Sequence, residues 1–262
     1  MFERASSSSG SGGKRRGPLA AILASLVAIA AKAQALLVLL FKAKFLLTFA
    51  TMFISMVVYG LAFGWAFGVG FVLILFVHEL GHFIAIRMRG LPAGAPVFIP
   101  FMGAIIGLRG RPVSAAEEAF IGGAGPLLGT IASAAVLLLP IGPVRLPLAY
   151  TGFFLQLFNL IPVSPLDGGR MVAAVDRRLW WFGLPLLLGV IILTGSWTLG
   201  ILLAMLVLSQ FFGRMRRPEP ASYFAVPLRV RLLALAAWLG LAAASGLGMA
   251  ISERLGHLQG IF

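Results

Sequence analysis

The chain contains no cysteine among its 262 residues, and it has only eight Asp and Glu residues. The missing thiols exclude disulfides and thiolate metal sites. Charged residues make up 11% of the chain and hydrophobic residues 60%, which excludes an ordinary soluble domain. The net charge of +13 comes from basic residues that mostly fall in short clusters between apolar runs. That pattern is typical of cytosolic loops in a membrane protein, so we expect no nucleic-acid partner.

Several apolar runs are long enough to cross a lipid bilayer, because a helix needs about 20 residues to span about 30 Å of hydrocarbon. The runs lie near residues 45–64, 66–87, 116–138, 146–163, 180–196, 198–213 and 230–250. They predict an all-α polytopic membrane protein with about six to seven transmembrane helices. If the basic clusters are cytosolic, the run at 66–87 ends on the cytosolic side.

The segments outside these runs suggest a simple domain organisation. Residues 1–17 are rich in Ser and Gly and end in a basic cluster, which predicts a disordered cytosolic tail. Residues 18–44 either span the membrane or lie in its cytosolic interface, and their lysines favour the interface. We expect residues 45–213 to form the functional core, and residues 214–262 to form a basic cytosolic linker and a final transmembrane helix.

The segment at 91–112 has too many Gly and Pro residues for a helix. Its alternating apolar residues predict two short strands that turn around Pro100 to Gly103. Non-helical backbone occurs at membrane depth only where it contacts protein or a wet cavity. We therefore expect a re-entrant β-hairpin-like loop beside a functional site, and the alternative is an ordinary cytosolic loop.

Two of the three histidines lie in the pentapeptide HELGH, at the end of the apolar run AFGVGFVLILFVHELGHFIAI. Ionisable groups at this depth are costly and mark function by default. The spacing of His78 and His82 places both imidazoles on one helix face, where they can bind zinc with Glu79 beside them as a base. The alternative is a pair of core histidines that are hydrogen-bonded to neighbouring helices.

Two imidazoles leave a tetrahedral zinc ion short of one protein ligand, with a further position open for water. Asp167 is a candidate for the missing ligand, although an Asp before Gly-Gly is also a common turn residue. The third histidine, His257, follows the last span and is expected on the outer side of the membrane, which makes it a poor candidate for this ligand. Glu117 and Glu118 begin an apolar run, where capping of a helix start is the expected role.

The two motifs together resemble those of one known family. HELGH in a transmembrane helix, followed by N-x-x-P-x-x-x-L-D-G in a later one, is similar to the site-2 protease family of intramembrane zinc metalloproteases, over about residues 66–170. The resemblance implies that His78, His82 and Asp167 bind Zn²⁺ and that Glu79 is the catalytic base. Asn159 matches the Asn of the second motif and could hold the substrate carbonyl or its oxyanion. Its alternative role is to cap a kinked helix.

The resemblance implies hydrolysis of peptide bonds in or near transmembrane segments of membrane-protein substrates, as in regulated intramembrane proteolysis. We expect a multi-pass protein of the inner or plasma membrane, with its active site toward the cytosol. An exposed strand edge from residues 95–108, which include Gly103, could pair with the locally unwound substrate. The short connection LPIGPVRLP leaves no room for a PDZ domain, and we also expect no CBS module. A metal-ion transporter and a non-catalytic scaffold on the same fold remain alternatives, and the substrate, regulatory signal and oligomeric state stay open.

Overall fold

The computed structural model describes residues 46–101, 103–108, 112–195 and 220–261, together with residues 32, 34 and 200. The predicted tail at 1–17, nearly all of the segment at 18–44 and nearly all of the predicted span at 198–213 lie outside the described residues. The elements below belong to one structural unit, which comprises Leu47–Phe262.

Among the residues that the structure describes, four helices are long and apolar enough to cross a membrane, and each coincides with a predicted run. They are the helix Leu46–Phe63, α2 (Trp65–Met88), α3 (Ala115–Leu138) and α8 (Leu228–Leu258). The chain is therefore an integral membrane protein. Two further helices, α4 (Arg145–Asn159) and α6 (Trp180–Thr194), have 15 residues each. Such a helix is about 22 Å long, which is short of the hydrocarbon thickness, so the count of six to seven spans stays a prediction.

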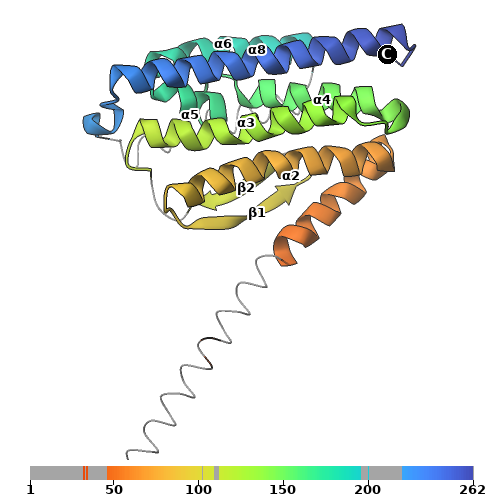
Figure 1. Cartoon of the computed structure of the whole chain (residues 1–262), viewed down its shortest axis with the longest axis horizontal. Coiled ribbons are helices and arrows are strands. Elements are labelled where there is room, and N and C mark those ends of the chain that lie inside the picture. The colour runs from red at the N-terminus through yellow and green to blue at the C-terminus, as the bar shows by residue number, and fades with distance from the viewer. Residues whose placement is uncertain are drawn as a thin grey trace, which may run out of the picture. The chain divides into compact units, whose positions relative to one another are not determined.

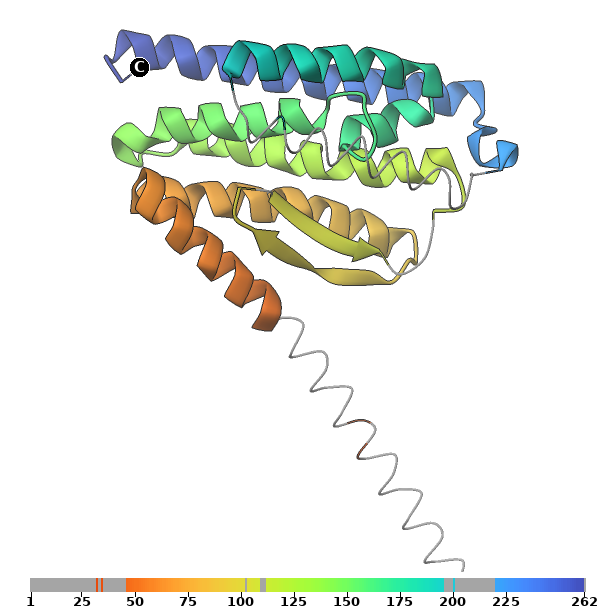
Figure 2. The same ribbon diagram turned by 180° about the vertical axis from the view of Figure 1, so that it is seen from behind.

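The helices are arranged in three layers (Figures 1 and 2). α2 and a β-hairpin form the first layer, and α3 and α4 lie in the middle layer with the short helix α5 (Asp167–Ala173). The third layer consists of α6 and α8. α3 packs against α2 and α5, so it lies between the two elements that carry the sequence motifs. Short 3-10 helices at Gly142–Val144, Arg177–Leu179 and Ala221–Phe224 join the longer elements.

The hairpin confirms the two predicted strands. β1 (Ala93–Ile99) pairs antiparallel with β2 (Gly103–Leu108), with Ile99 opposite Gly103. Gly103 has a φ angle of 96°, a conformation that residues with a Cβ atom rarely adopt. The tight turn therefore accounts for a glycine at this position.

The helix Leu46–Phe63 covers the outer edge of β1. The Thr48 hydroxyl donates a hydrogen bond to the Pro96 carbonyl at 2.7 Å, and the Phe98 amide donates to the Thr51 hydroxyl at 3.2 Å. These side chains take the place of a third strand, so this edge of the sheet is closed.

Glycines allow the helices to approach one another closely, as is common in membrane bundles. Gly248 of α8 lies directly against the ring of Phe153 on α4, where a Cβ atom would clash with the ring. Gly246, two residues earlier, has no atom within 4 Å of the position that its Cβ would take. The two positions therefore differ in what a larger side chain would meet.

We expect Gly248→Val to lower the free energy of unfolding by about 1–3 kcal/mol relative to Gly246→Val, because only the former overpacks a helix crossing. Both variants carry the same change in helix propensity, so their difference isolates the packing. Thermal unfolding of the detergent-solubilised protein measures it. Equal unfolding temperatures would contradict the close contact between α4 and α8.

Candidate metal centre

Three side chains that the two motifs supply meet inside the helix bundle. His78 and His82 lie on one face of α2, and Asp167 is the first residue of α5. All three are buried, with exposed fractions of 2%, 7% and 6%. The two Nε2 atoms are 3.2 Å apart, and they lie 3.2 Å (His78) and 3.1 Å (His82) from Asp167 Oδ2. The fold thus brings together residues that lie 85 or more positions apart in the sequence.

The other ring nitrogen of each histidine points away from this cluster and contacts a hydrogen-bond acceptor. His82 Nδ1 lies 2.8 Å from the Ile121 carbonyl oxygen on α3, and His78 Nδ1 lies 2.6 Å from Gln156 Oε1 on α4. Since both partners are oxygen acceptors, each Nδ1 carries the proton and donates it. In the tautomer that has this proton, the lone pair of each imidazole is on its Nε2 atom.

Two imidazole nitrogens and one carboxylate oxygen therefore converge on one buried space. A cation in that space would contact all three atoms at once. Ligands at about 2.0–2.1 Å from a tetrahedral ion lie about 3.3 Å from one another, close to the observed separations. Two imidazole nitrogens and one carboxylate oxygen also form a donor set that suits zinc. The residues therefore fit a divalent metal ion with one further position for a small molecule.

Glu79 lies next to this cluster. It follows His78 on α2, and only 6% of its surface is exposed. Its carboxylate is close enough to interact electrostatically with His78, Asp167 and Arg170. A buried carboxylate beside a metal position can accept or donate a proton there.

The second carboxylate oxygen of Asp167 is part of a chain of polar contacts. Arg170 lies 3.4 Å from Asp167 Oδ1 and 3.5 Å from Glu118 Oε1. The Tyr223 hydroxyl donates to the other Glu118 oxygen. Glu118, expected to cap a helix, therefore reaches the site through Arg170. Glu117 does have the expected capping role, because its carboxylate accepts from the Val113 amide.

The structure places two other predicted site residues differently from the three ligand candidates. The Asn159 amide donates to the Leu155 carbonyl at 2.9 Å, one turn back in its own helix, which fits the structural alternative for this residue. Gly103 lies in the hairpin turn.

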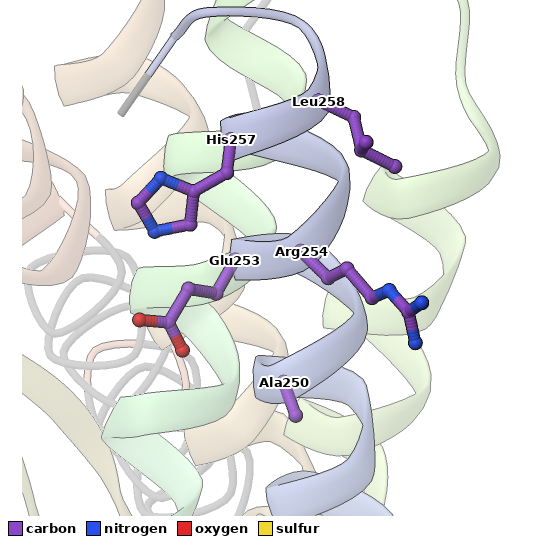
Figure 3. Close-up of a pocket in the computed structure, with 5 residues that line it drawn as sticks. All are labelled: Ala250, Glu253, Arg254, His257 and Leu258. Carbon is purple, nitrogen blue, oxygen red and sulfur yellow. The ribbon is translucent and has the colours of Figure 1, made fainter.

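His257 lies in the last turn of α8 and lines an open pocket with Glu253 and Arg254 (Figure 3). In the described part of the chain, His257 does not belong to a group of three metal-ligating side chains, whereas His78, His82 and Asp167 do.

Gln156 is the functional residue that the motifs do not reveal. It lies three residues before Asn159, outside the second motif, and it contacts the first histidine of HELGH. The sequence does contain a sign of this role, since Gln156 is a strongly polar residue within the apolar run at 146–163. Polar residues at membrane depth face the bundle interior and find partners there.

The glycine-rich stretch of α3 makes room for the site. A Cβ atom on Gly125 would clash with the ring of His82, and one on Gly81 of α2 would clash with the Ala124 carbonyl. A Cβ atom on Gly122 would crowd the Asp167 carbonyl. These small residues let α2 and α5 approach α3 closely enough for the ligand atoms to meet.

The chain is similar to known proteins over part of its length. No family model matches the chain. Over 112 residues, or 38% of this chain, it is 35% identical to the protein named "Putative zinc metalloprotease Rip3" in two strains of Mycobacterium tuberculosis. The chain spans 28% of the length of that relative. The solved site-2 protease from Methanocaldococcus jannaschii aligns with 76% of this chain and 88% of its own, at 21% identity and a TM-score of 0.37. The similarity to Rip3 confirms the resemblance to zinc metalloproteases that the motifs indicate.

We expect Gly125→Ala to weaken the binding of Zn²⁺ by about 10-fold or more, because the added methyl group displaces the imidazole of His82. Gly123→Ala is the matched control, since its methyl group meets only the flexible end of the Met171 side chain. Competition with a chromophoric chelator measures both affinities. If the two variants bind zinc equally well, the close contact between Gly125 and His82 does not shape the site.

Proposed function

We propose that this protein is an intramembrane zinc metalloprotease of the site-2 protease type. It would hydrolyse peptide bonds in or near the transmembrane segments of membrane-protein substrates. One observation carries the proposal: two imidazole nitrogens and a carboxylate oxygen converge, buried, in a bundle of apolar helices. In this proposal His78, His82 and Asp167 hold Zn²⁺. The similarity to Rip3 supports the same activity.

The residues around the cluster suggest how hydrolysis proceeds. Zinc held here would supply a Lewis acid that activates water and polarises the scissile carbonyl. Glu79 accepts a proton from the attacking water while the oxygen of that water bonds to the carbonyl carbon. Glu79 then gives that proton to the amide nitrogen as the C–N bond breaks. Because Glu79 is buried beside the cluster, the proton that it accepts stays within the site until it reaches the amide nitrogen.

The hairpin offers a place for an unwound substrate to bind. On β1, the Pro96 carbonyl and the Phe98 amide point outward, toward the helix Leu46–Phe63. Their partners in the antiparallel register are Ile106 and Ala104, whose backbone groups therefore point outward from the opposite edge, along β2. Among the described residues, β2 has backbone hydrogen bonds only to β1. We propose that the substrate adds as a strand to this edge and that Gly103 shapes the turn.

The basic residues support a cytosolic location for the site. His78 and His82 lie about 15 and 9 Å before the C-terminal end of α2, and Arg87 lies in its last turn. The positive-inside rule favours the cytosolic side for this end. We therefore propose a protein of the inner or plasma membrane whose metalloprotease core is formed by residues 45–213, followed by α8 as a last span.

One N–H of the Asn159 amide donates to the Leu155 carbonyl. The amide nitrogen carries a second N–H, which could donate to the substrate carbonyl or its oxyanion. We keep this role as a proposal for the substrate-bound protein.

We expect Glu79→Gln to retain zinc and to reduce cleavage by about 10²- to 10⁴-fold, because it removes the proton acceptor without removing a ligand. Glu253→Gln, at an exposed position near the end of α8, is the control and should cleave normally. Cleavage of a reconstituted transmembrane substrate and the zinc content measure the two effects. Asp167→Ala should lose the metal as well as the activity. Transport of zinc into vesicles by Glu79→Gln, with no cleavage by the unaltered protein, would instead favour a transporter.

We expect Ala104→Pro to impair cleavage while zinc stays bound, because it removes an outward-facing N–H from β2 and leaves the pairing with β1 intact. Ala104→Gly keeps this N–H and should cleave at nearly the normal rate. A substitution of Gly103 by proline is a poorer test, since the φ angle of 96° at this position excludes proline. Normal cleavage by Ala104→Pro would argue against strand addition at this edge.

A further inference from the structure

Gln156 lies at the centre of the bundle, at a position with no exposed surface. Both ends of its side-chain amide have partners. The oxygen accepts a hydrogen bond from His78 Nδ1 at 2.6 Å, and Nε2 donates to the Gly152 carbonyl at 3.1 Å, one turn back in α4. Burial of an amide costs free energy unless hydrogen bonds compensate for the lost water. Here the compensating partner is a candidate metal ligand, so the amide calls for a functional explanation.

The Gly152 carbonyl fixes the orientation of the amide. If the amide were turned over, its oxygen would face a carbonyl oxygen and its NH₂ group would face the imidazole. The observed orientation presents an acceptor to His78 Nδ1, which therefore keeps its proton. The lone pair is then confined to Nε2, the atom that lies 3.2 Å from Asp167 Oδ2. Gln156 thus determines which nitrogen of His78 faces the cluster.

The neighbouring helix is built around this amide. A Cβ atom on Gly129 of α3 would clash with the Gln156 amide group. The glycine therefore provides the space in which the Gln156 side chain reaches His78.

A neutral acceptor has a particular advantage at this position. The site already contains two buried carboxylates, Asp167 and Glu79. A third carboxylate behind His78 would add negative charge where desolvation is costly, whereas an amide orients the ring without adding charge. By comparison, the second histidine is oriented by the neutral Ile121 carbonyl.

We propose that Gln156 is a positioning residue that fixes the orientation and the tautomer of His78 for metal binding. This inference rests on the proposed function, because it assumes that His78 binds the metal. Outer partners of this kind typically change metal affinity by about 10- to 100-fold when they are removed.

The test compares variants that differ in the acceptor. Gln156→Met has a similar shape but no strong acceptor, and Gln156→Glu keeps an acceptor oxygen. Ser245→Ala is the matched control, because it removes another buried interhelical hydrogen bond, the 2.9 Å contact with Thr130, away from the cluster. Zinc affinity is measured by chelator competition, and Co²⁺ substitution reports the ligand geometry through its visible absorption.

We expect Gln156→Met to weaken zinc binding by about 10- to 100-fold and to change the Co²⁺ spectrum. Gln156→Glu keeps the acceptor for His78 but adds a buried charge, so it should weaken zinc binding less than Gln156→Met does, and Ser245→Ala should change neither measurement. Gly129→Ala displaces the amide without altering it and should weaken binding in the same direction, which provides a second variant if Gln156→Met does not fold.

Two results would overturn the positioning role. One is unaltered zinc affinity and Co²⁺ spectrum in both Gln156→Met and Gly129→Ala. The other is an equal loss of affinity in Ser245→Ala, which would show a general effect of packing. Failure of the proposed function looks different, because the unaltered protein would then bind no divalent metal and would cleave no substrate.

Discussion

The site depends on the convergence of two imidazole nitrogens and one carboxylate oxygen in a buried space. The Nε2 atoms of His78 and His82 and the Oδ2 atom of Asp167 lie within about 3.2 Å of one another. The three side chains are almost fully buried, so bulk water does not separate these atoms. A divalent cation would bind all three atoms at once. The hydrogen bonds from the Nδ1 atoms to Gln156 and to the Ile121 carbonyl hold both rings in this arrangement.

This constraint explains why small residues line the surfaces around the cluster. α3 carries glycines where it meets the His82 ring, the Asp167 backbone and the Gln156 amide. Glycines lower the intrinsic stability of a helix in water. In a membrane bundle this cost is offset by close packing, which also lets side chains from α2, α4 and α5 reach one point. The site and the helix packing therefore depend on each other, because a larger side chain at one of these glycines would displace a residue of the site.

The hairpin and the polar chain from Tyr223 to Asp167 connect the cluster with the rest of the unit. On one side, hydroxyls of the helix Leu46–Phe63 close the edge of β1, and the proposed substrate strand would add at the edge of β2. On the other side, Arg170 contacts both Asp167 and Glu118, while Tyr223 binds Glu118. The segment before α8 is therefore linked to Asp167 through Glu118 and Arg170. The proposed proteolysis would require such order, since a substrate would have to unwind and water would have to reach a buried metal.

The sequence by itself determined the apolar helices, the paired strands and the HELGH and LDGG motifs. Each is a local pattern, in which periodicity, length or spacing of a few residues decides the outcome. The capping role of Glu117 was also local and predictable. Only the tertiary structure decided that Gln156 contacts His78, that Glu118 contacts Arg170 and that the Asn159 amide binds a carbonyl of its own helix. Those contacts join residues 52 to 78 positions apart, or depend on which face of a helix meets its neighbour. Helix packing sets that geometry, and a uniformly apolar sequence does not encode it in any short pattern.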